Sequence, residues 1–186
     1  MADDSAMAIY HERQRLQLCL LHALNNLLQG HDRFTRQILD AIADSLEEQH
    51  ATPWSTRNLF FLPAKQHRNP LTGNYDANVL IAALSSRGLE ARWHDRRSAI
   101  ADDDLSRPNL AGLIANTSSQ RFLGLWRSRH WIALRRVHGS WYNLDSDLPM
   151  PVAMRGAGEV RDFLNSLRDQ GAELFFVFRK EEQGDE

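Results

Sequence analysis

Residues 130–145 read HWIALRRVHGSWYNLD, two runs rich in β-branched and aromatic residues on either side of His138-Gly139. A two-residue connection of this kind is typical of a tight β-hairpin, because its residues must adopt positive φ angles that glycine tolerates well. If His138 and Gly139 form the whole turn, Val137 lies opposite Ser140. The stretch therefore predicts two antiparallel strands with a fixed register.

The register of this hairpin brings ionisable side chains together. Side chains alternate between the two faces of a strand, so His130 shares a face with Asp145 and Asp147. Asp147 is directly opposite His130, and Asp145 is a diagonal neighbour at roughly 7 Å, within reach of an imidazole. The residues alone do not decide which carboxylate pairs with His130. An ordinary exposed ion pair on a surface hairpin is the alternative.

Helix signals dominate the first half of the chain and strand signals the second. Helices are expected at 19–29, 36–49, 55–62, 77–87 and 159–169, and strands at 89–93, 111–115, 130–137, 140–144 and 173–178. Thr35 and Asp76 are placed to cap two of these helices, and Gly30 is placed to end the first. Helices followed by hairpin-linked strands predict an α+β fold with a mostly antiparallel sheet.

The composition is that of one globular domain. The chain has 186 residues, of which 42% are hydrophobic and 25% charged, with a net charge of −2. This charge carries no basic footprint for nucleic acid, so no nucleic-acid partner is expected. The single cysteine excludes internal disulfides and thiolate zinc cages. Nothing in the sequence requires a cofactor.

The ends of the chain are expected to flank a single domain over residues 9–179. Residues 1–8 are small and polar and predict a flexible N-terminus, and residues 180–186 predict a charged, flexible tail. Neither a signal peptide nor an apolar run long enough to cross a bilayer is recognised. We expect an intracellular monomer, cytoplasmic by default, with nuclear or membrane-associated pools left open.

Cys19 is the candidate nucleophile. It falls at the predicted start of a helix, where backbone N–H groups and the helix dipole stabilise a thiolate. Gln14 precedes it by five residues and carries an amide that could donate to a developing oxyanion. The alternative is that Cys19 is only a small buried hydrophobic residue, as free cysteines often are.

The histidines other than His130 carry weaker signals. His22 lies on the same predicted helix as Cys19 and is expected to pack or to hydrogen-bond within the fold. The others are expected in solvated loops or at the surface: His11, His31, His50, His67, His94 and His138. No two of them have the spacing of metal ligands, and residues 102–104, three aspartates, are interpreted as a solvated loop. No metal site is therefore expected.

A thiol, an imidazole and a carboxylate are the parts of the triad used by cysteine hydrolases. In that arrangement the carboxylate holds the tautomer of the imidazole. The imidazole takes the thiol proton and later protonates the leaving group. Cys19, His130 and one of the two aspartates are therefore candidates for such a triad.

Four ordered motifs resemble the Josephin family of deubiquitinating cysteine proteases. They are YHERQ…LC…HALNNLLQ over residues 10–29, GNYDANV over 73–79, HWIALR over 130–135 and WYNLDS over 141–146. The second motif is most similar to that of the short Josephin-like members. The resemblance covers residues 9–179, nearly the whole chain.

This resemblance implies a papain-like cysteine protease fold, in which helices flank a mostly antiparallel sheet and a helical hairpin, here residues 34–70, projects near the cleft. It also implies site roles. Cys19 would be the nucleophile, His130 the general base and Asp145 the third triad member. Gln14 would form the oxyanion hole together with the backbone N–H of Cys19. Some family members carry asparagine at the position of Asp145, so orientation of the imidazole is part of its implied role.

The implied substrate is ubiquitin joined through its C-terminal glycine to a lysine, in chains or on ubiquitinated proteins. Trp131 could form one wall of a narrow cleft, with plain packing as the alternative. The same choice applies to apolar residues of the proposed hairpin, which either form its own core or face ubiquitin: Phe34, Leu59, Phe60, Phe61 and Leu62. Two other functions remain open, a ubiquitin-binding module with little turnover and another Cys-His-Asp enzyme such as an acyltransferase.

Overall fold

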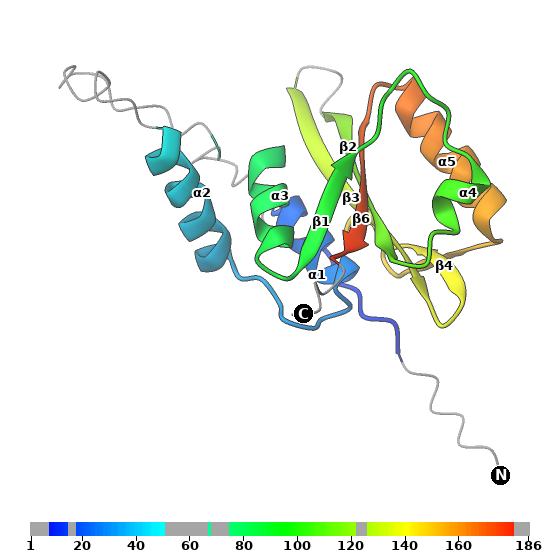
Figure 1. The fold of residues 1–186 in the computed structure, drawn as a ribbon, viewed down its shortest axis with the longest axis horizontal. Helices are drawn as coiled ribbons and strands as arrows, with labels where there is room; N and C mark the ends of the chain where they lie inside the picture. Colours follow the sequence, from blue (N-terminus) through cyan, green and yellow to red (C-terminus); the bar gives the residue numbers. More distant parts are fainter. Residues whose placement is uncertain (1–7, 15–17, 51–66, 68–74, 122–125, 181–186) are drawn as a thin grey trace, which may run out of the picture.

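The computed structural model describes residues 8–14, 18–50, 67, 75–121 and 126–180 (Figure 1). The helices are α1 (Cys19–Leu27), α2 (Arg36–His50), α3 (Ala77–Ser85), α4 (Asp102–Leu105) and α5 (Ala157–Asp169). The strands are β1 (Leu89–Trp93), β2 (Leu110–Arg121), β3 (Trp126–Val137), β4 (Ser140–Asn143), β5 (Val152–Met154) and β6 (Glu173–Arg179).

The strands form one six-stranded sheet in the order β1-β6-β2-β3-β4-β5. Every neighbouring pair in this order is antiparallel. Helices α1 and α3 lie on one side of the sheet and α4 and α5 on the other (Figure 1). The expected α+β fold, with helices flanking an antiparallel sheet, is confirmed.

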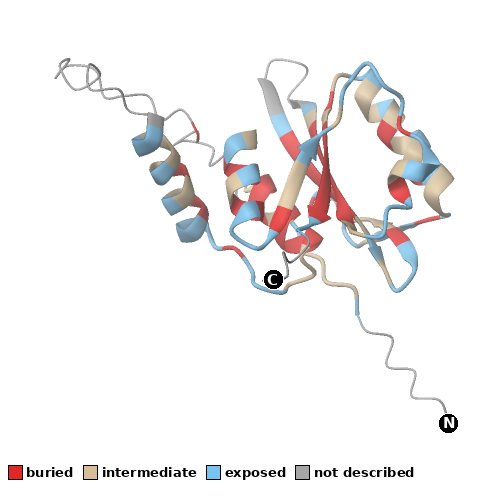
Figure 2. Ribbon diagram, in the orientation of Figure 1, coloured by how far each residue is buried: buried red, intermediate tan, exposed pale blue. Residues whose placement is uncertain are grey.

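The core has two halves, one on each face of the sheet (Figure 2). Alternate residues of the central strands supply the two halves, as the two-residue period of a strand requires. On β3, Trp131 and Ala133 pack with α1 and α3, whereas Ile132 and Leu134 pack with the α5 side. Because both faces are covered, the central strands are apolar on both sides, and the sheet forms a rigid base for the residues at its ends.

The hairpin between β3 and β4 has the predicted turn. Val137 pairs with Ser140, and His138 and Gly139 have φ angles of 49° and 84°. Positive φ at both central residues is the signature of the tight hairpin turn. The paired register extends back only to Leu134 and Asn143, so the aspartates of this hairpin lie beyond the regular ladder.

The helix N-caps follow the prediction closely. The Thr35 hydroxyl accepts a hydrogen bond from the backbone N–H of Ile38 at 3.3 Å. The Asp76 carboxylate accepts from the first N–H groups of α3, at 3.0 and 3.1 Å. The first helix ends two residues earlier than predicted, since α1 stops at Leu27 with Leu28 as its C-cap. Gln29, with a φ of 55°, therefore takes the position expected for Gly30, which follows it with a φ of 75°.

Two short elements were not predicted. Residues 102–104, expected as a solvated loop, begin the single-turn helix α4, and β5 is a three-residue edge strand. In α4 the Asp104 carboxylate accepts from the backbone N–H of Ala101 at 3.1 Å, and Asp102 pairs with Arg161 at 2.9 Å. The loop expectation was wrong because aspartates in a first turn stabilise the helix N-terminus.

The proposed helical hairpin is described in part. Its first helix, α2, packs beside α3, on the side away from the sheet (Figure 1). Phe34, just before α2, is 2% exposed and belongs to the core. Of the two options for this residue, packing inside the protein and facing ubiquitin, its burial favours packing. The predicted helix at 55–62, with the apolar residues 59–62, lies outside the described residues.

Among the described helices, none combines the length and the apolar character needed to cross a bilayer.

Candidate active site

Helix α1 carries Cys19 as its first residue. Eight of the nine residues of this helix are buried, so packing fixes its position firmly against the sheet. Leu18, the N-cap, makes no side-chain capping hydrogen bond, as expected from the lack of a polar residue there. The side chain of Cys19 is 3% exposed, and its Sγ lies 3.8 Å from the carbonyl oxygen of Arg129 on β3. The thiol therefore lies beside the residue that immediately precedes His130.

His130 pairs with Asp145. The imidazole Nε2 donates to Oδ1 of Asp145 at 2.6 Å, whereas Oδ2 of Asp147 is 3.7 Å from the same nitrogen. The His130 residue is 6% exposed. The side chain of Asp145 is 16% exposed and that of Asp147 is 43% exposed. Geometry and burial therefore select Asp145 as the direct partner and leave Asp147 as a second, more solvated charge.

The electrostatics of His130 reflect these neighbours. Burial lowers the pKa of the imidazole, but hydrogen bonds with Asp145 and Cys19 and the negative charges of Asp145 and Asp147 outweigh it and raise the pKa to about 10. The Cys19 side chain is thus one of the hydrogen-bonding groups at this imidazole. A histidine with such neighbours holds its proton firmly at neutral pH.

A compact turn orients Asp145. Its backbone N–H donates to Oδ1 of Asn143 at 3.0 Å, and its own Oδ1 accepts from the backbone N–H of Asp147 at 2.9 Å. The turn closes with a bond from the Leu148 N–H to the Asp145 carbonyl oxygen at 3.0 Å. The same carbonyl accepts from Nε2 of His11 at 2.9 Å. The carboxylate is therefore held from its own loop and from the N-terminal segment.

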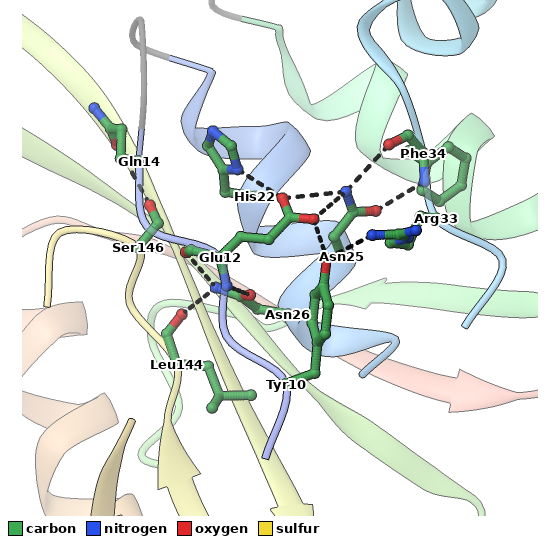
Figure 3. A network of polar contacts seen from close by, with 10 residues as sticks. All are labelled: Tyr10, Glu12, Gln14, His22, Asn25, Asn26, Arg33, Phe34, Leu144 and Ser146. Carbon is green, nitrogen blue, oxygen red and sulfur yellow. Dashed lines mark hydrogen bonds and ion pairs between the residues drawn. The ribbon is translucent and has the colours of Figure 1, made fainter. Parts of the chain in front are cut away.

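Gln14 is attached to the same loop (Figure 3). Its backbone N–H donates to the Ser146 carbonyl oxygen at 2.8 Å, and the Ser146 hydroxyl donates to Gln14 Oε1 at 3.4 Å. Because the amide oxygen accepts this bond, the amide nitrogen is the end of the side chain that can donate to a ligand.

A partly buried polar network ties the N-terminal segment to α1 (Figure 3). The Glu12 carboxylate accepts from Nδ1 of His22 at 2.7 Å, from Nδ2 of Asn25 at 3.1 and 3.3 Å, and from the Tyr10 hydroxyl. Burial raises the pKa of Glu12, but these hydrogen bonds outweigh it and lower the pKa below its usual value. His22 thus hydrogen-bonds within the fold, as expected.

The Asn26 side chain completes the network with backbone contacts. Its Oδ1 accepts from the Glu12 N–H at 2.5 Å, and its Nδ2 donates to the carbonyl oxygens of Glu12 at 3.2 Å and of Leu144 at 2.9 Å. Asn26 is 0% exposed. One buried carboxamide therefore contacts both segments that flank the thiol.

The structure brings Cys19, His130 and Asp145 together, with Gln14 on the adjoining segment. Trp131 is 1% exposed, donates its indole N–H to the Tyr75 carbonyl oxygen at 3.3 Å, and packs in the core. These are the contacts of a core residue, as in the packing alternative, and its side chain offers almost no surface to a substrate.

Two histidines expected in solvated positions are engaged instead. His11 is half-buried against the Asp145 carbonyl oxygen. His67 is 6% exposed, and its Nδ1 donates to Oδ2 of Asp76 at 2.8 Å. The surface expectation was wrong for both. The partner of His11 is distant in sequence, and His67 is separated from Asp76 by a segment whose sequence has no helix or strand period.

One group of the described residues has the spacing of metal ligands. The ligand atoms of His130, Asp145 and Asp147 lie within 4.8 Å of one another, a spacing that a cation could use. The 2.6 Å hydrogen bond between His130 and Asp145 already accounts for this proximity. A metal is therefore not needed to explain the cluster.

Sequence reasoning missed the supporting residues of the site, namely His11, Glu12, Asn26 and Ser146. The helix pattern gave no signal for Asn26. Successive helical residues turn by about 100°, so Asn26 lies outside the apolar stripe of Leu20, Leu24 and Leu27, and the pattern does not predict its burial. The identity of its partners depends on contacts between residues more than a hundred positions apart, as with Leu144.

The chain resembles known proteins over most of its length. Residues 14–178 match the family model described as Josephin. A Josephin-like protein of Arabidopsis thaliana is 48% identical over 163 residues, which cover 87% of this chain and 45% of that protein, so the chain spans less than half of that relative's length.

Two further relatives extend the comparison. Josephin-2 of Homo sapiens is 44% identical over 186 residues, covering 97% of this chain and 91% of that protein. An ataxin-3 homolog of Arabidopsis thaliana is 29% identical over 178 residues, covering 91% of this chain and 58% of that protein. The resemblance carried by the four motifs is confirmed over most of the chain, and the protein belongs to the Josephin family.

Proposed function

We propose that the protein is a cysteine-type deubiquitinase, which hydrolyses the peptide or isopeptide bond at the C-terminal glycine of ubiquitin. The observation that carries this proposal is the contact of His130 with Asp145 at 2.6 Å, with the Cys19 side chain as a further hydrogen-bonding group of the same imidazole. The family, which the sequence motifs connect with deubiquitinating cysteine proteases, supports ubiquitin as the substrate class.

The hydrogen bonds of His130 assign the roles in the first step. Nε2 of His130 is hydrogen-bonded to Asp145, so Nδ1 is the nitrogen available to the thiol. With its pKa raised to about 10, His130 already holds the proton of Cys19 at neutral pH, and the thiolate sulfur attacks the carbonyl carbon of the terminal glycine. The carbonyl oxygen gains negative charge, and donors aimed at it stabilise the transition state. We assign this role to the Gln14 amide nitrogen and the backbone N–H of Cys19.

The remaining steps return the enzyme to its starting state. The imidazolium of His130 gives its proton to the leaving amine, the carbon–nitrogen bond breaks and a thioester remains on Cys19. His130 then removes a proton from water, and the resulting hydroxide attacks the thioester. The carbon–sulfur bond breaks, the new carboxylic acid of ubiquitin loses its proton to solvent, and the Cys19 thiolate is left beside the protonated imidazole. Asp145 keeps the tautomer and orientation of the imidazole throughout.

A ubiquitin probe with an electrophile at its C-terminus tests the proposal directly. The chain has one cysteine, so a single covalent adduct on cysteine can only be at Cys19. We expect one adduct by intact mass and none with the Cys19→Ala variant. Ubiquitin binding without an adduct would contradict the proposal and favour a binding module. Cleavage of diubiquitin by Cys19→Ala at the parent rate would also contradict it.

Several further expectations belong to the same proposal. We propose that the protein acts as a monomer in the cytoplasm on ubiquitin chains or ubiquitinated proteins. Light scattering and cell fractionation test the first two. Transfer of an acyl group to an amine, without cleavage of ubiquitin conjugates, would instead indicate an acyltransferase.

A further inference from the structure

We propose that Asn26 is a positioning residue, whose buried carboxamide holds the segment bearing Gln14 and the loop bearing Asp145 on helix α1. The inference rests on the proposed function, because it concerns the residues given catalytic roles there. Asn26 itself has no role in the chemistry. It acts through the backbone of Glu12, two residues before Gln14, and of Leu144, immediately before Asp145.

The Asn26 side chain makes three hydrogen bonds, directed at two segments of the chain. Oδ1 accepts from the backbone N–H of Glu12, and Nδ2 donates to the Glu12 carbonyl oxygen, so the side chain pairs with this residue as a neighbouring strand would. The other bond of Nδ2 reaches the Leu144 carbonyl oxygen at 2.9 Å. Because the residue is 0% exposed, water cannot replace these bonds.

The two tethered segments also contact each other. Gln14 N–H donates to the Ser146 carbonyl oxygen, and His11 donates to the Asp145 carbonyl oxygen. These contacts link the segments beyond the point where Asn26 holds them, and Figure 3 shows Gln14 next to Ser146. A side chain at the junction of both segments and the nucleophile's helix therefore fixes the spacing among Gln14, Asp145 and Cys19.

Asn25 provides a matched control. It is the adjacent residue, has the same side chain and is 3% exposed. Its carboxamide binds the Glu12 carboxylate and the backbone of Phe34, at 2.8 and 3.1 Å, and so connects α1 with the segment leading to α2. Both asparagines are buried and hydrogen-bonded, but only Asn26 contacts the loop of the triad carboxylate.

The experiment compares Asn26→Ala with Asn25→Ala in the full chain, below the melting temperature of each variant. With a fluorogenic ubiquitin C-terminal substrate, we expect Asn26→Ala to lower kcat about 100-fold, the usual cost of misplacing catalytic groups by about an ångström. KM is expected to change little, since Asn26 is buried. Asn25→Ala is expected to lower the melting temperature similarly while kcat changes much less.

A second readout is the NMR titration of the His130 imidazole. The pKa of His130 is raised to about 10 through its contact with Asp145. Displacing the Asp145 loop weakens that contact, so Asn26→Ala is expected to lower this pKa and Asn25→Ala to leave it near the parent value. Equal kcat and equal His130 pKa in the two variants would show that Asn26 is merely structural and would overturn the inference.

Two arrangements keep the test decisive. If Asn26→Ala does not fold, Asn26→Ser, which keeps a donor and an acceptor at shorter reach, replaces it in the same comparison. The NMR titration needs no substrate. A parent protein that fails to cleave ubiquitin would therefore refute the proposed function, whereas the titration would still decide whether Asn26 positions the Asp145 loop.

Discussion

Within the described residues, two buried histidines each pair with an aspartate, at similar distances but with different neighbours. His130 and Asp145 are 2.6 Å apart, and His67 and Asp76 are 2.8 Å apart. Both imidazole side chains are 8% exposed. The first pair includes a thiol among its contacts, whereas the second lies at the start of helix α3. A histidine–aspartate pair is therefore not a sign of catalysis by itself.

The distribution of the carboxylate's bonds distinguishes the two pairs. Asp76 shares its oxygens with the backbone N–H groups of Asn78 and Val79, so most of its bonds stabilise the end of a helix. Among the described residues, the Asp145 carboxylate accepts one such backbone bond, from Asp147, and that bond shapes its own turn. Asp145 therefore serves mainly to orient His130, whereas Asp76 is mainly an N-cap that also anchors a histidine.

Removing each histidine gives the largest expected contrast. His130→Ala removes the general base and is expected to lower turnover of a ubiquitin substrate by several orders of magnitude, as triad substitutions do. His67→Ala is expected to leave turnover within about threefold of the parent value, because His67 contributes to the stability of the fold and not to the reaction. Steady-state kinetics on both variants, at a temperature where both are folded, measures the contrast. Equal losses would mean that the second pair also supports the chemistry.

The two aspartates near His130 sharpen the comparison within the site. Asp145→Ala removes the 2.6 Å partner and is expected to lower kcat by about 100-fold or more. Asp147→Ala removes a carboxylate at 3.7 Å that is half-exposed, and a solvated charge has a small effect, about twofold to fivefold. A larger loss from Asp147→Ala would show that it, and not Asp145, orients His130.

The pH dependence of stability is the third contrast. The folded pKa of His130, about 10, exceeds the unfolded value of about 6.5. The stabilisation from this group is therefore complete below about pH 6.5, declines as the pH rises, and is lost above about pH 10. Urea unfolding at pH 7 and pH 10 is expected to show a smaller loss of stability in His130→Gln than in the parent. Identical losses would contradict a raised pKa for His130.

The smallest expected effect concerns the capping pair. Asp76→Ala removes the N-cap of α3 and the partner of His67, and is expected to cost about 1–2 kcal/mol of unfolding free energy. Asp76→Asn keeps a capping oxygen and is expected to recover about half of that loss. Denaturant titrations measure both, and activity per folded molecule is expected to stay at the parent level. A change in kcat would mean that α3 influences the active site.

The active hairpin was predictable because local rules determine it. The two-residue turn at His138-Gly139 sets the register, and the register places Asp145 and Asp147 near His130. The choice of Asp145 needed more than alternation. The ladder stops at Asn143, and the turn that follows, not strand pairing, aims the carboxylate.

The second pair and the N-terminal network were not predictable in the same way. His67 meets Asp76 across a segment without a periodic pattern, and Asn26 meets Leu144 across more than half of the chain. Such contacts depend on which helices, strands and loops pack together, and local sequence patterns do not predict that. Short elements such as α4 and β5 were missed because single turns and three-residue strands lack a measurable period.

The burial of α1 has a consequence for how activity is lost. Eight of its nine residues are buried, and the nucleophile is the first of them. Amide hydrogens of such a helix exchange with solvent only in rare, nearly global openings. Cys19 is the first residue of this helix, so unfolding of α1 should separate the thiol from His130 and abolish its chemistry in the same transition. Loss of the covalent adduct with the ubiquitin probe is therefore a reporter of global unfolding.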